Sequence, residues 1–134
     1  MKKIVLSFTI ALALTGCGNK LKCTRTIKND VMTQKTTYIV YTDKDTITKV
    51  EATEKTEVAN KEINENYDYL LSFRFEDLNN NNIKYDYSHK KNKYDLKITY
   101  DLSTMSEDAI TAYIETKNID EYKTKLSDEN FTCK

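Results

Sequence analysis

The sequence predicts an α+β domain in which a mostly antiparallel β-sheet carries two or three helices on one face. Three patterns support this prediction. Residues 83–88 and 93–102 alternate apolar and polar side chains, residues 60–78 repeat apolar side chains at helical spacing, and residues 104–126 contain two helix-start signals. Cys23 and Cys133, near the two ends of the predicted domain, are expected to join those ends by a disulfide.

The clearest predicted strand covers residues 93–102, in which every second side chain is apolar: Tyr94, Leu96, Ile98, Tyr100 and Leu102. Residues 83–88 alternate in the same way, so the two segments should form an antiparallel hairpin. Upstream, residues 36–42 are apolar on both faces, and a polar strand follows near residues 46–58. Ile47 is out of phase with Val50 and Ala52, which predicts a β-bulge or a late strand start.

Glycine and proline are nearly absent, with two glycines and no proline in the chain. Turns must therefore use Asn and Asp, which tolerate left-handed backbone and hydrogen-bond locally. The predicted turns are at residues 29–30, 43–45, 79–82 and 90–92. The same shortage excludes phosphate-binding glycine loops and dinucleotide fingerprints.

Three helices are predicted. The first covers residues 60–78 and places five apolar residues in one stripe: Ile63, Tyr67, Leu70, Leu71 and Leu78. The second and third begin at Thr104 and Asn118, each of which precedes a Glu by three residues, as in a capping box. Their core-facing residues are Ile110, Tyr113 and Ile114 in the second helix, and Ile119, Tyr122 and Leu126 in the third. Residues 131–133 should then return, extended, to a first strand around residues 23–28.

The N-terminus indicates export. Lys2 and Lys3 form a positive n-region, and the uncharged, mostly apolar residues 4–14 form an h-region. As a helix, this stretch would span about half of a ~30 Å hydrocarbon core, which is too short for a permanent transmembrane span.

The next segment, Leu14-Thr15-Gly16-Cys17, resembles the lipobox of bacterial lipoproteins. The resemblance implies that the signal peptidase recognises Leu14, Thr15 and Gly16, and that lipidated Cys17 becomes the new N-terminus. Two acyl chains, of which palmitate is a typical one, give stable membrane anchoring. An ordinary secretory signal with a chance cysteine is the alternative. The expected organisation is a cleaved signal peptide, a lipidated tether and a single α+β domain: residues 1–16, 17–22 and 23–134.

Acylation of Cys17 would leave Cys23 and Cys133, which we expect to form a disulfide in an extracytoplasmic setting. Closing a loop of this length contributes on the order of 4–5 kcal/mol in the chain-entropy model. Two free, buried thiols are the alternative. A two-cysteine metal site agrees less well with the four Cys or His ligands that zinc prefers, because the only histidine, His89, is distant in sequence.

A family resemblance covers most of the mature chain. It rests on the lipobox, on tyrosine-rich hairpin strands, and on two short motifs: Lys22-Cys23 and Tyr122…Leu126…Phe131-Thr132-Cys133-Lys134. These features are similar to the YehR-like family of small bacterial lipoproteins, in which glycine more often precedes the final aromatic residue than the Glu129-Asn130 found here. The resemblance implies a disulfide-tied α+β lipoprotein and brings no established activity with it.

The sequence contains no pattern typical of a catalytic or metal site. Without Lys2 and Lys3 the chain has 19 basic and 21 acidic residues, and this net charge of −2 argues against nucleic-acid binding. His89 lies in a basic turn and should be solvated. Asp43 and Asp45, with later glutamates, vaguely resemble a calcium loop, but Thr48 stands where glycine is required. We expect no catalytic residue, no cofactor and no metal.

The ten tyrosines raise the question of a binding surface. Tyr38, Tyr41 and Tyr69 have no predicted face, and the other seven fall at core-facing positions. We expect a monomeric, noncatalytic binding module on the outer side of the cell membrane, with an envelope protein, polymer or small ligand as its partner. A small hydrolase or metal-dependent envelope enzyme that uses carboxylates is the alternative, and a third hypothesis gives the released peptide, residues 9–16, a role as a secreted signal.

Overall fold

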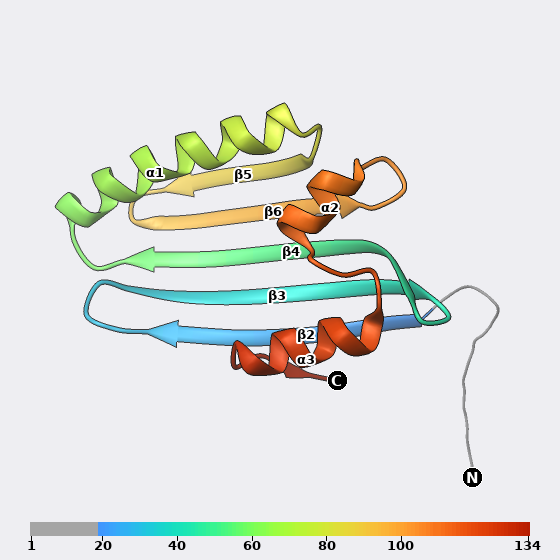
Figure 1. The fold of residues 1–134 in the computed structure, drawn as a ribbon. Helices are drawn as coiled ribbons and strands as arrows, with labels where there is room; N and C mark the ends of the chain where they lie inside the picture. Colours follow the sequence, from blue (N-terminus) through green and yellow to red (C-terminus); the bar gives the residue numbers. More distant parts are fainter. Residues whose placement is uncertain (1–18) are drawn as a thin grey trace, which may run out of the picture.

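A computed structural model describes residues 19–134, so the predicted signal-peptidase and lipidation residues, Leu14, Thr15, Gly16 and Cys17, lie outside the described residues. Six antiparallel strands form one sheet in the order β5-β6-β4-β3-β2-β7, and three helices accompany it (Figure 1). The α+β prediction is therefore confirmed.

The elements follow the chain in this order: β2 (Asn19–Lys28), β3 (Met32–Asp43), β4 (Thr46–Val58), α1 (Lys61–Asn80), β5 (Lys84–Lys90), β6 (Lys93–Asp101), α2 (Glu107–Tyr113), α3 (Ile119–Asp128) and β7 (Thr132–Cys133). Asn19 already pairs with Thr42 of β3, so residues 19–22, which we expected in the tether, belong to the sheet. Within residues 19–134, no helix has the length and apolarity to cross a membrane.

The turns lie where the sequence predicts them, but lysine rather than Asn or Asp takes the left-handed position in two of them. Lys44, Asn82 and Lys91 have positive φ angles of 57°, 57° and 58°, respectively, in three of the expected turns. At the β2–β3 turn, the side chain of Asn29 accepts hydrogen bonds from the N–H groups of Val31 and Met32. These local interactions reverse the chain without glycine or proline.

The predicted irregularity near Ile47 is a β-bulge. Tyr41 pairs with Lys49 across β3 and β4, whereas Thr42 pairs with Ile47, so Thr48 is the extra residue. The extra residue lets Ile47 and Val50 both be buried, which explains why their spacing breaks the period of two.

Asparagine side chains cap α1 and α3. The Oδ1 atom of Asn60 accepts the N–H of Ile63 at 3.0 Å, and that of Asn118 accepts the N–H of Glu121 at 3.0 Å. The start predicted for the third helix is thus confirmed.

The start predicted for the second helix is wrong by two residues. Ser106 caps α2 by accepting the N–H of Ala109 at 3.1 Å. Thr104 instead donates its hydroxyl to the carbonyl of Asp101 at 3.1 Å, in the turn that ends β6. Thr104 is therefore held in that turn, and the helix begins at the next available cap.

One member of the predicted apolar stripe of α1 is exposed. Leu71 and Leu78 are buried, but Leu70 is 65% exposed. The buried side of α1 includes Phe75, whose ring stacks on Tyr85 at a centroid distance of 4.6 Å. This contact turns α1 toward β5, and Leu70, about 100° round the helix from Leu71, faces solvent.

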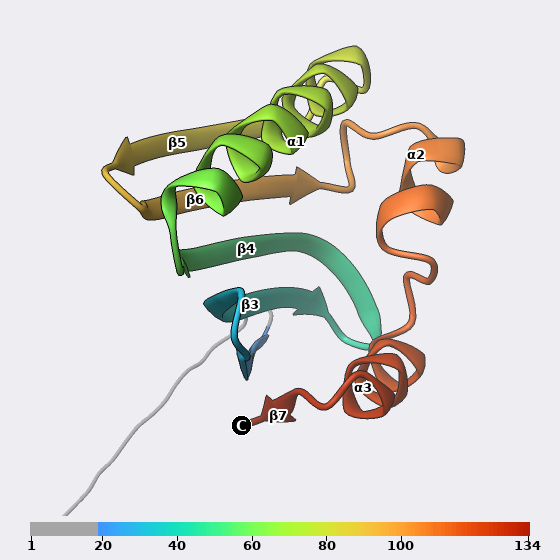
Figure 2. The same ribbon diagram turned by 90° about the vertical axis from the view of Figure 1, so that its left-hand side faces the viewer.

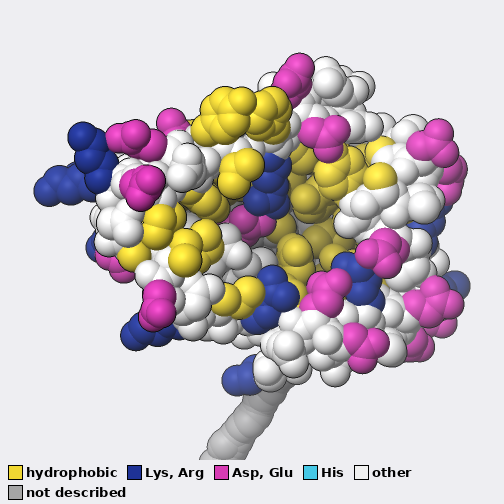
Figure 3. Space-filling model, turned by 60° about the vertical axis from the view of Figure 1, so that its left-hand side comes forward, with side chains coloured by type: hydrophobic (Ala, Val, Ile, Leu, Met, Phe, Trp, Pro, Cys, Tyr) yellow, Lys and Arg dark blue, Asp and Glu magenta, His cyan; other side chains and the backbone are white. Residues whose placement is uncertain are grey.

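All three helices lie on one face of the sheet, the inner face (Figure 2). This face carries the odd-numbered residues of β2 and β5 and the even-numbered residues of β3, β4 and β6. In Figure 1, α1 runs along the β5 side while α3 lies over β2, which leaves the middle of the inner face uncovered. Figure 3 shows that the molecule is hollowed here, with hydrophobic side chains in the hollow and charged side chains at its edge.

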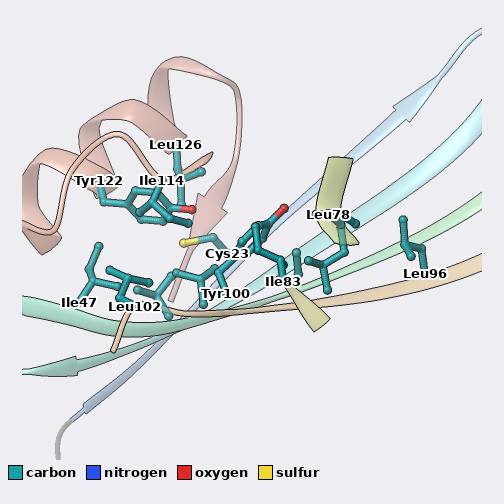
Figure 4. Packing of buried hydrophobic residues seen from close by; sticks show 14 of the residues in the cluster. Cys23, Ile47, Leu78, Ile83, Leu96, Tyr100, Leu102, Ile114, Tyr122 and Leu126 are labelled. Atoms are coloured by element: carbon teal, nitrogen blue, oxygen red, sulfur yellow. The ribbon is translucent and has the colours of Figure 1, made fainter. Parts of the chain in front are cut away.

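The hydrophobic core is one continuous cluster that runs from beneath α1 to beneath α2 and α3, with Cys23 and Tyr100 in between (Figure 4). One end lies beneath α1 and includes Leu78, Ile83 and Leu96. The other end lies beneath α2 and α3, and its buried residues include Ile47, Leu102, Ile110, Ile114, Ile119, Tyr122 and Leu126. The core positions predicted for these two short helices are therefore confirmed.

The predicted disulfide joins the two ends of the described domain. Cys23 and Cys133 are opposite each other in the β2–β7 register and are bonded, with a Cα–Cα distance of 4.0 Å. Next to the bridge, Lys22 and Lys134 exchange backbone hydrogen bonds of 3.2 and 2.8 Å. A strand of only two residues is thereby held at the edge of the sheet.

Reduction of the Cys23–Cys133 bridge should lower the free energy of unfolding by about 2–5 kcal/mol, because the bridge closes a long loop in the unfolded chain. Urea unfolding with and without reductant measures this difference. The Cys23→Ser/Cys133→Ser variant is the control and should match the reduced protein. Equal urea midpoints for the oxidised and reduced protein would contradict the expectation.

Candidate functional site

Buried and half-buried polar residues lie on the inner face of the sheet, between α1 and the C-terminal segment. Glu54 and Thr36 are 8% and 4% exposed, although most buried residues of this protein are apolar. The register aligns Arg25, Thr36 and Glu54 across β2, β3 and β4. Together with Arg74 of α1 and Tyr38 of β3, these residues form what we call the inner-face cluster.

A bidentate ion pair between Arg74 and Glu54 joins α1 to the sheet. Arg74 donates from Nη1 to Glu54 Oε1 at 2.8 Å and from Nη2 to Glu54 Oε2 at 2.6 Å. Burial by itself would lower the pKa of Arg74, but the hydrogen bonds and the negative charge of Glu54 raise it overall. The guanidinium therefore stays charged and is held in one orientation by Glu54.

Tyr38 and Tyr100 lie close to this ion pair, and Tyr122 lies close to these two tyrosines. Burial, with smaller contributions from Tyr100 and Glu54, raises the pKa of Tyr38 to about 12. Burial also raises the pKa of Tyr100, against the opposing effect of Arg74, and it raises the pKa of Tyr122 together with the nearby Tyr38. All three hydroxyls are therefore protonated at neutral pH and can donate hydrogen bonds.

Arg25 forms the opposite wall of the cluster. Its guanidinium lies over the ring of Phe131 at 4.5 Å from the centroid, and its Nη1 donates to the carbonyl of Glu129 at 3.0 Å. The ring of Tyr38 stacks on the same phenylalanine at 5.0 Å. The Nε atom of Arg25 is buried and has no hydrogen-bond partner within residues 19–134, so one donor of a well-oriented arginine is unused.

An apolar ridge borders the cluster on α1. It consists of Tyr69, Leu70 and Phe73, which are 64%, 65% and 54% exposed. Tyr69 and Phe73 make an edge-to-face contact with a centroid distance of 5.0 Å. Leu70 lies one helical turn before Arg74 and thus on the same side of α1, so the apolar ridge and the polar cluster are continuous.

The structure separates the three tyrosines for which the sequence predicts no face. Tyr38 belongs to the inner-face cluster, and Tyr69 to the apolar ridge. Tyr41 lies on the opposite face of the sheet, where its hydroxyl donates to Glu51 Oε1 at 2.7 Å. The hydrogen bond to Glu51, followed by burial, raises the pKa of Tyr41.

The ion pair between Glu54 and Arg74 was not predicted from the sequence, although the position of Glu54 in the sequence is unusual. Glu54 occupies a core-facing position in the alternation of β4, between Ala52 and Val58, and a charged residue at such a position needs a partner. Nothing in the local sequence identifies Arg74 as that partner.

The residues considered for catalysis or calcium binding do not come together. His89 is exposed, as expected, and its ring stacks on Tyr94 at a centroid distance of 4.1 Å. Glu51 and Glu54 project from opposite faces of β4. In the described part of the chain, no group of three or more His, Cys, Asp or Glu residues is arranged to hold a metal ion.

Comparisons with known proteins give no match, whether with protein-family models, with curated proteins or with solved structures. The resemblance to the YehR-like lipoproteins therefore stays a prediction from the residues quoted above.

Glu54→Gln should lower the free energy of unfolding by about 1–3 kcal/mol, because it leaves the guanidinium of Arg74 half-buried without a charged partner. The lower part of that range allows for solvent screening of Arg74, whose side chain is 38% exposed. Urea unfolding measures the loss. The double variant Glu54→Leu/Arg74→Met should recover part of it, and an unchanged midpoint for Glu54→Gln would contradict the assigned role of the pair.

Proposed function

We propose that this protein is a lipid-anchored, extracytoplasmic binding module that takes its ligand in the hollow of the inner face. The observation that carries the proposal is the set of oriented hydrogen-bond donors beside an exposed apolar ridge. Arg25 and Arg74 are both fixed in place, by Phe131 and by Glu54, so a ligand would meet a preorganised surface.

The surface indicates the chemistry of the ligand. The half-buried side chains of Arg25 and Tyr38 offer donors to a hydrogen-bond acceptor, and the ridge around Leu70 calls for an apolar group or a flat ring. A segment of an envelope polymer or a small ligand that combines both features fits, as does an envelope protein that presents them.

The sequence supports the location. The positive n-region, the short apolar stretch and the lipobox ending at Cys17 together favour export and attachment through diacylglycerol. We therefore place the domain on the outer side of the cell membrane.

A binding role agrees with the state of the buried carboxylate. Both oxygens of Glu54 accept hydrogen bonds from Arg74, which leaves this group poorly suited to accept a proton from a substrate. The hydrolase alternative stays a prediction with no specific observation in its favour, and the proposed signalling role of residues 9–16 lies outside the described residues.

The anchor is tested by the intact mass of the protein purified from membranes. The mass should fit residues 17–134 with a diacylglycerol-based modification on Cys17 and should increase by two hydrogens on reduction. Cys17→Ser should remove the protein from the membrane fraction. An unlipidated protein, or an unchanged membrane fraction for Cys17→Ser, would contradict lipid anchoring.

The binding site is tested with a single tryptophan, since the chain has none. In the Phe73→Trp variant, soluble fragments of cell-wall polymer or a small-ligand panel should give a saturable shift in tryptophan emission. The additional change Arg25→Met should weaken this binding by about tenfold, because it removes a charge-assisted donor. The matched control Tyr41→Trp, on the other face of the sheet, should show no shift. A shift confined to the control would place the binding site on that face instead.

A further inference from the structure

Charge is distributed unequally between the two sides of the molecule. The outer face of the sheet, opposite the helices, carries the even-numbered residues of β2 and β5 and the odd-numbered residues of β3, β4 and β6. Its strand residues comprise ten lysines and six acidic residues, a net charge of +4. The three helices contain four basic and ten acidic residues, a net charge of −6.

Within residues 19–134, lysines without an ion pair lie at both edges of the outer face, on β5 and β6 as well as on β2, but only the β2 edge lacks acidic residues on its own strand. In the middle of the sheet, Lys55 forms an ion pair with Asp95 at 3.2 Å, and Glu51 forms longer ion pairs with Lys49 and Lys97 at 4.0 and 3.9 Å. On β2, by contrast, the outer face has three exposed lysines and no acidic residue: Lys20, Lys22 and Lys28. None of these three forms an ion pair with the residues that the structure describes.

The β2 side of the outer face presents an aromatic residue suited to an interface. The ring of Tyr41 lies 5.3 Å from Lys20 Nζ and 4.3 Å from Lys49 Nζ. Beside it, Ile39 is half-buried opposite Lys22. Tyrosine rings and lysine side chains, with apolar bodies and polar ends, are stable at the headgroup level of a bilayer.

We propose that the outer face of the sheet lies against the anionic headgroups of the membrane that anchors the chain. This inference rests on the proposed lipidation of Cys17. Only Gly18 separates that cysteine from β2, and each residue spans at most about 3.6 Å, so the anchor would keep Lys20 and Lys22 near the headgroups. An anionic surface attracts lysines that lie within a Debye length and repels the acidic helices.

This orientation decides where the ligand site points. The inner face and its hollow would face away from the membrane, toward the rest of the envelope, while the face without helices would be covered by lipid headgroups.

The test uses the lipidated protein, purified from membranes and reconstituted into vesicles of phosphatidylcholine with or without phosphatidylglycerol. Lysines are acetylated briefly with a water-soluble reagent, and each site is quantified by mass spectrometry. Modification of Lys22 and of Lys35, an exposed outer-face residue of β3, should be about fivefold slower in the anionic vesicles, since each lysine near such a surface is attracted appreciably. Lys61 and Lys123, on the helices, should be acetylated at the same rate in both kinds of vesicle. High salt should remove the difference in acetylation rate at Lys22 and Lys35.

Two matched charge-reversal variants show whether the protection depends on the outer face itself or only on the net charge of the protein. In the unsubstituted protein, Lys55 and Lys97, which lie on the same outer face, should also react more slowly in the anionic vesicles. Lys22→Glu/Lys35→Glu should abolish this protection of Lys55 and Lys97, whereas Lys61→Glu/Lys123→Glu, with the same change in net charge, should leave it intact. Equal behaviour of the two variants would overturn the proposed orientation.

The remaining outcomes distinguish this inference from the anchor itself. A protein that does not float with phosphatidylcholine vesicles contradicts the anchor. A protein that floats, but whose Lys22 and Lys61 respond alike to phosphatidylglycerol, overturns the orientation alone. Protection of Lys22 by a soluble anionic polymer, with none from anionic vesicles, would overturn it too and assign the face to the polymer.

Discussion

The disulfide between Cys23 and Cys133 is the constraint on which the second half of the domain depends. β7 has two residues and pairs only with Cys23 and Thr24, so few backbone hydrogen bonds hold it. The bridge fixes this strand and, with it, Phe131, on which Arg25 and Tyr38 pack. One wall of the inner-face cluster is thus built from a segment whose position is determined by a covalent bond.

The other wall depends on an ion pair. Arg74 reaches from α1 to Glu54 at the centre of the sheet, and two tyrosines lie close to the two charged groups. Buried charges of this kind are poor contributors to stability compared with apolar residues of similar size. Their presence beside the apolar core is therefore more easily explained by the surface they create than by the fold they support.

The single-sided arrangement of the helices gives the sheet two different faces. The inner face combines apolar packing with the hollow, and the outer face alternates lysines, threonines and acidic residues. Charged side chains along exposed strands also hinder edge-to-edge association of sheets. The separation of charge links the two proposals, because a face held toward the membrane leaves the opposite face free for a ligand.

Local patterns in the sequence determined the hairpin of β5 and β6, the turns, the bulge beside Ile47, the start of α3 and the pairing of two cysteines. These features depend on residues that are close in sequence or on the small number of available cysteines. Tertiary structure alone decided the rest. Asp101 holds Thr104 in a turn, which moves the start of α2, and the contact of Phe75 with Tyr85 turns Leu70 outward. The candidate site joins Glu54 to Arg74, 20 residues apart, and Arg25 to Glu129, 104 residues apart. Such partners are set by strand register and helix rotation across the whole sheet, and no local periodicity encodes them.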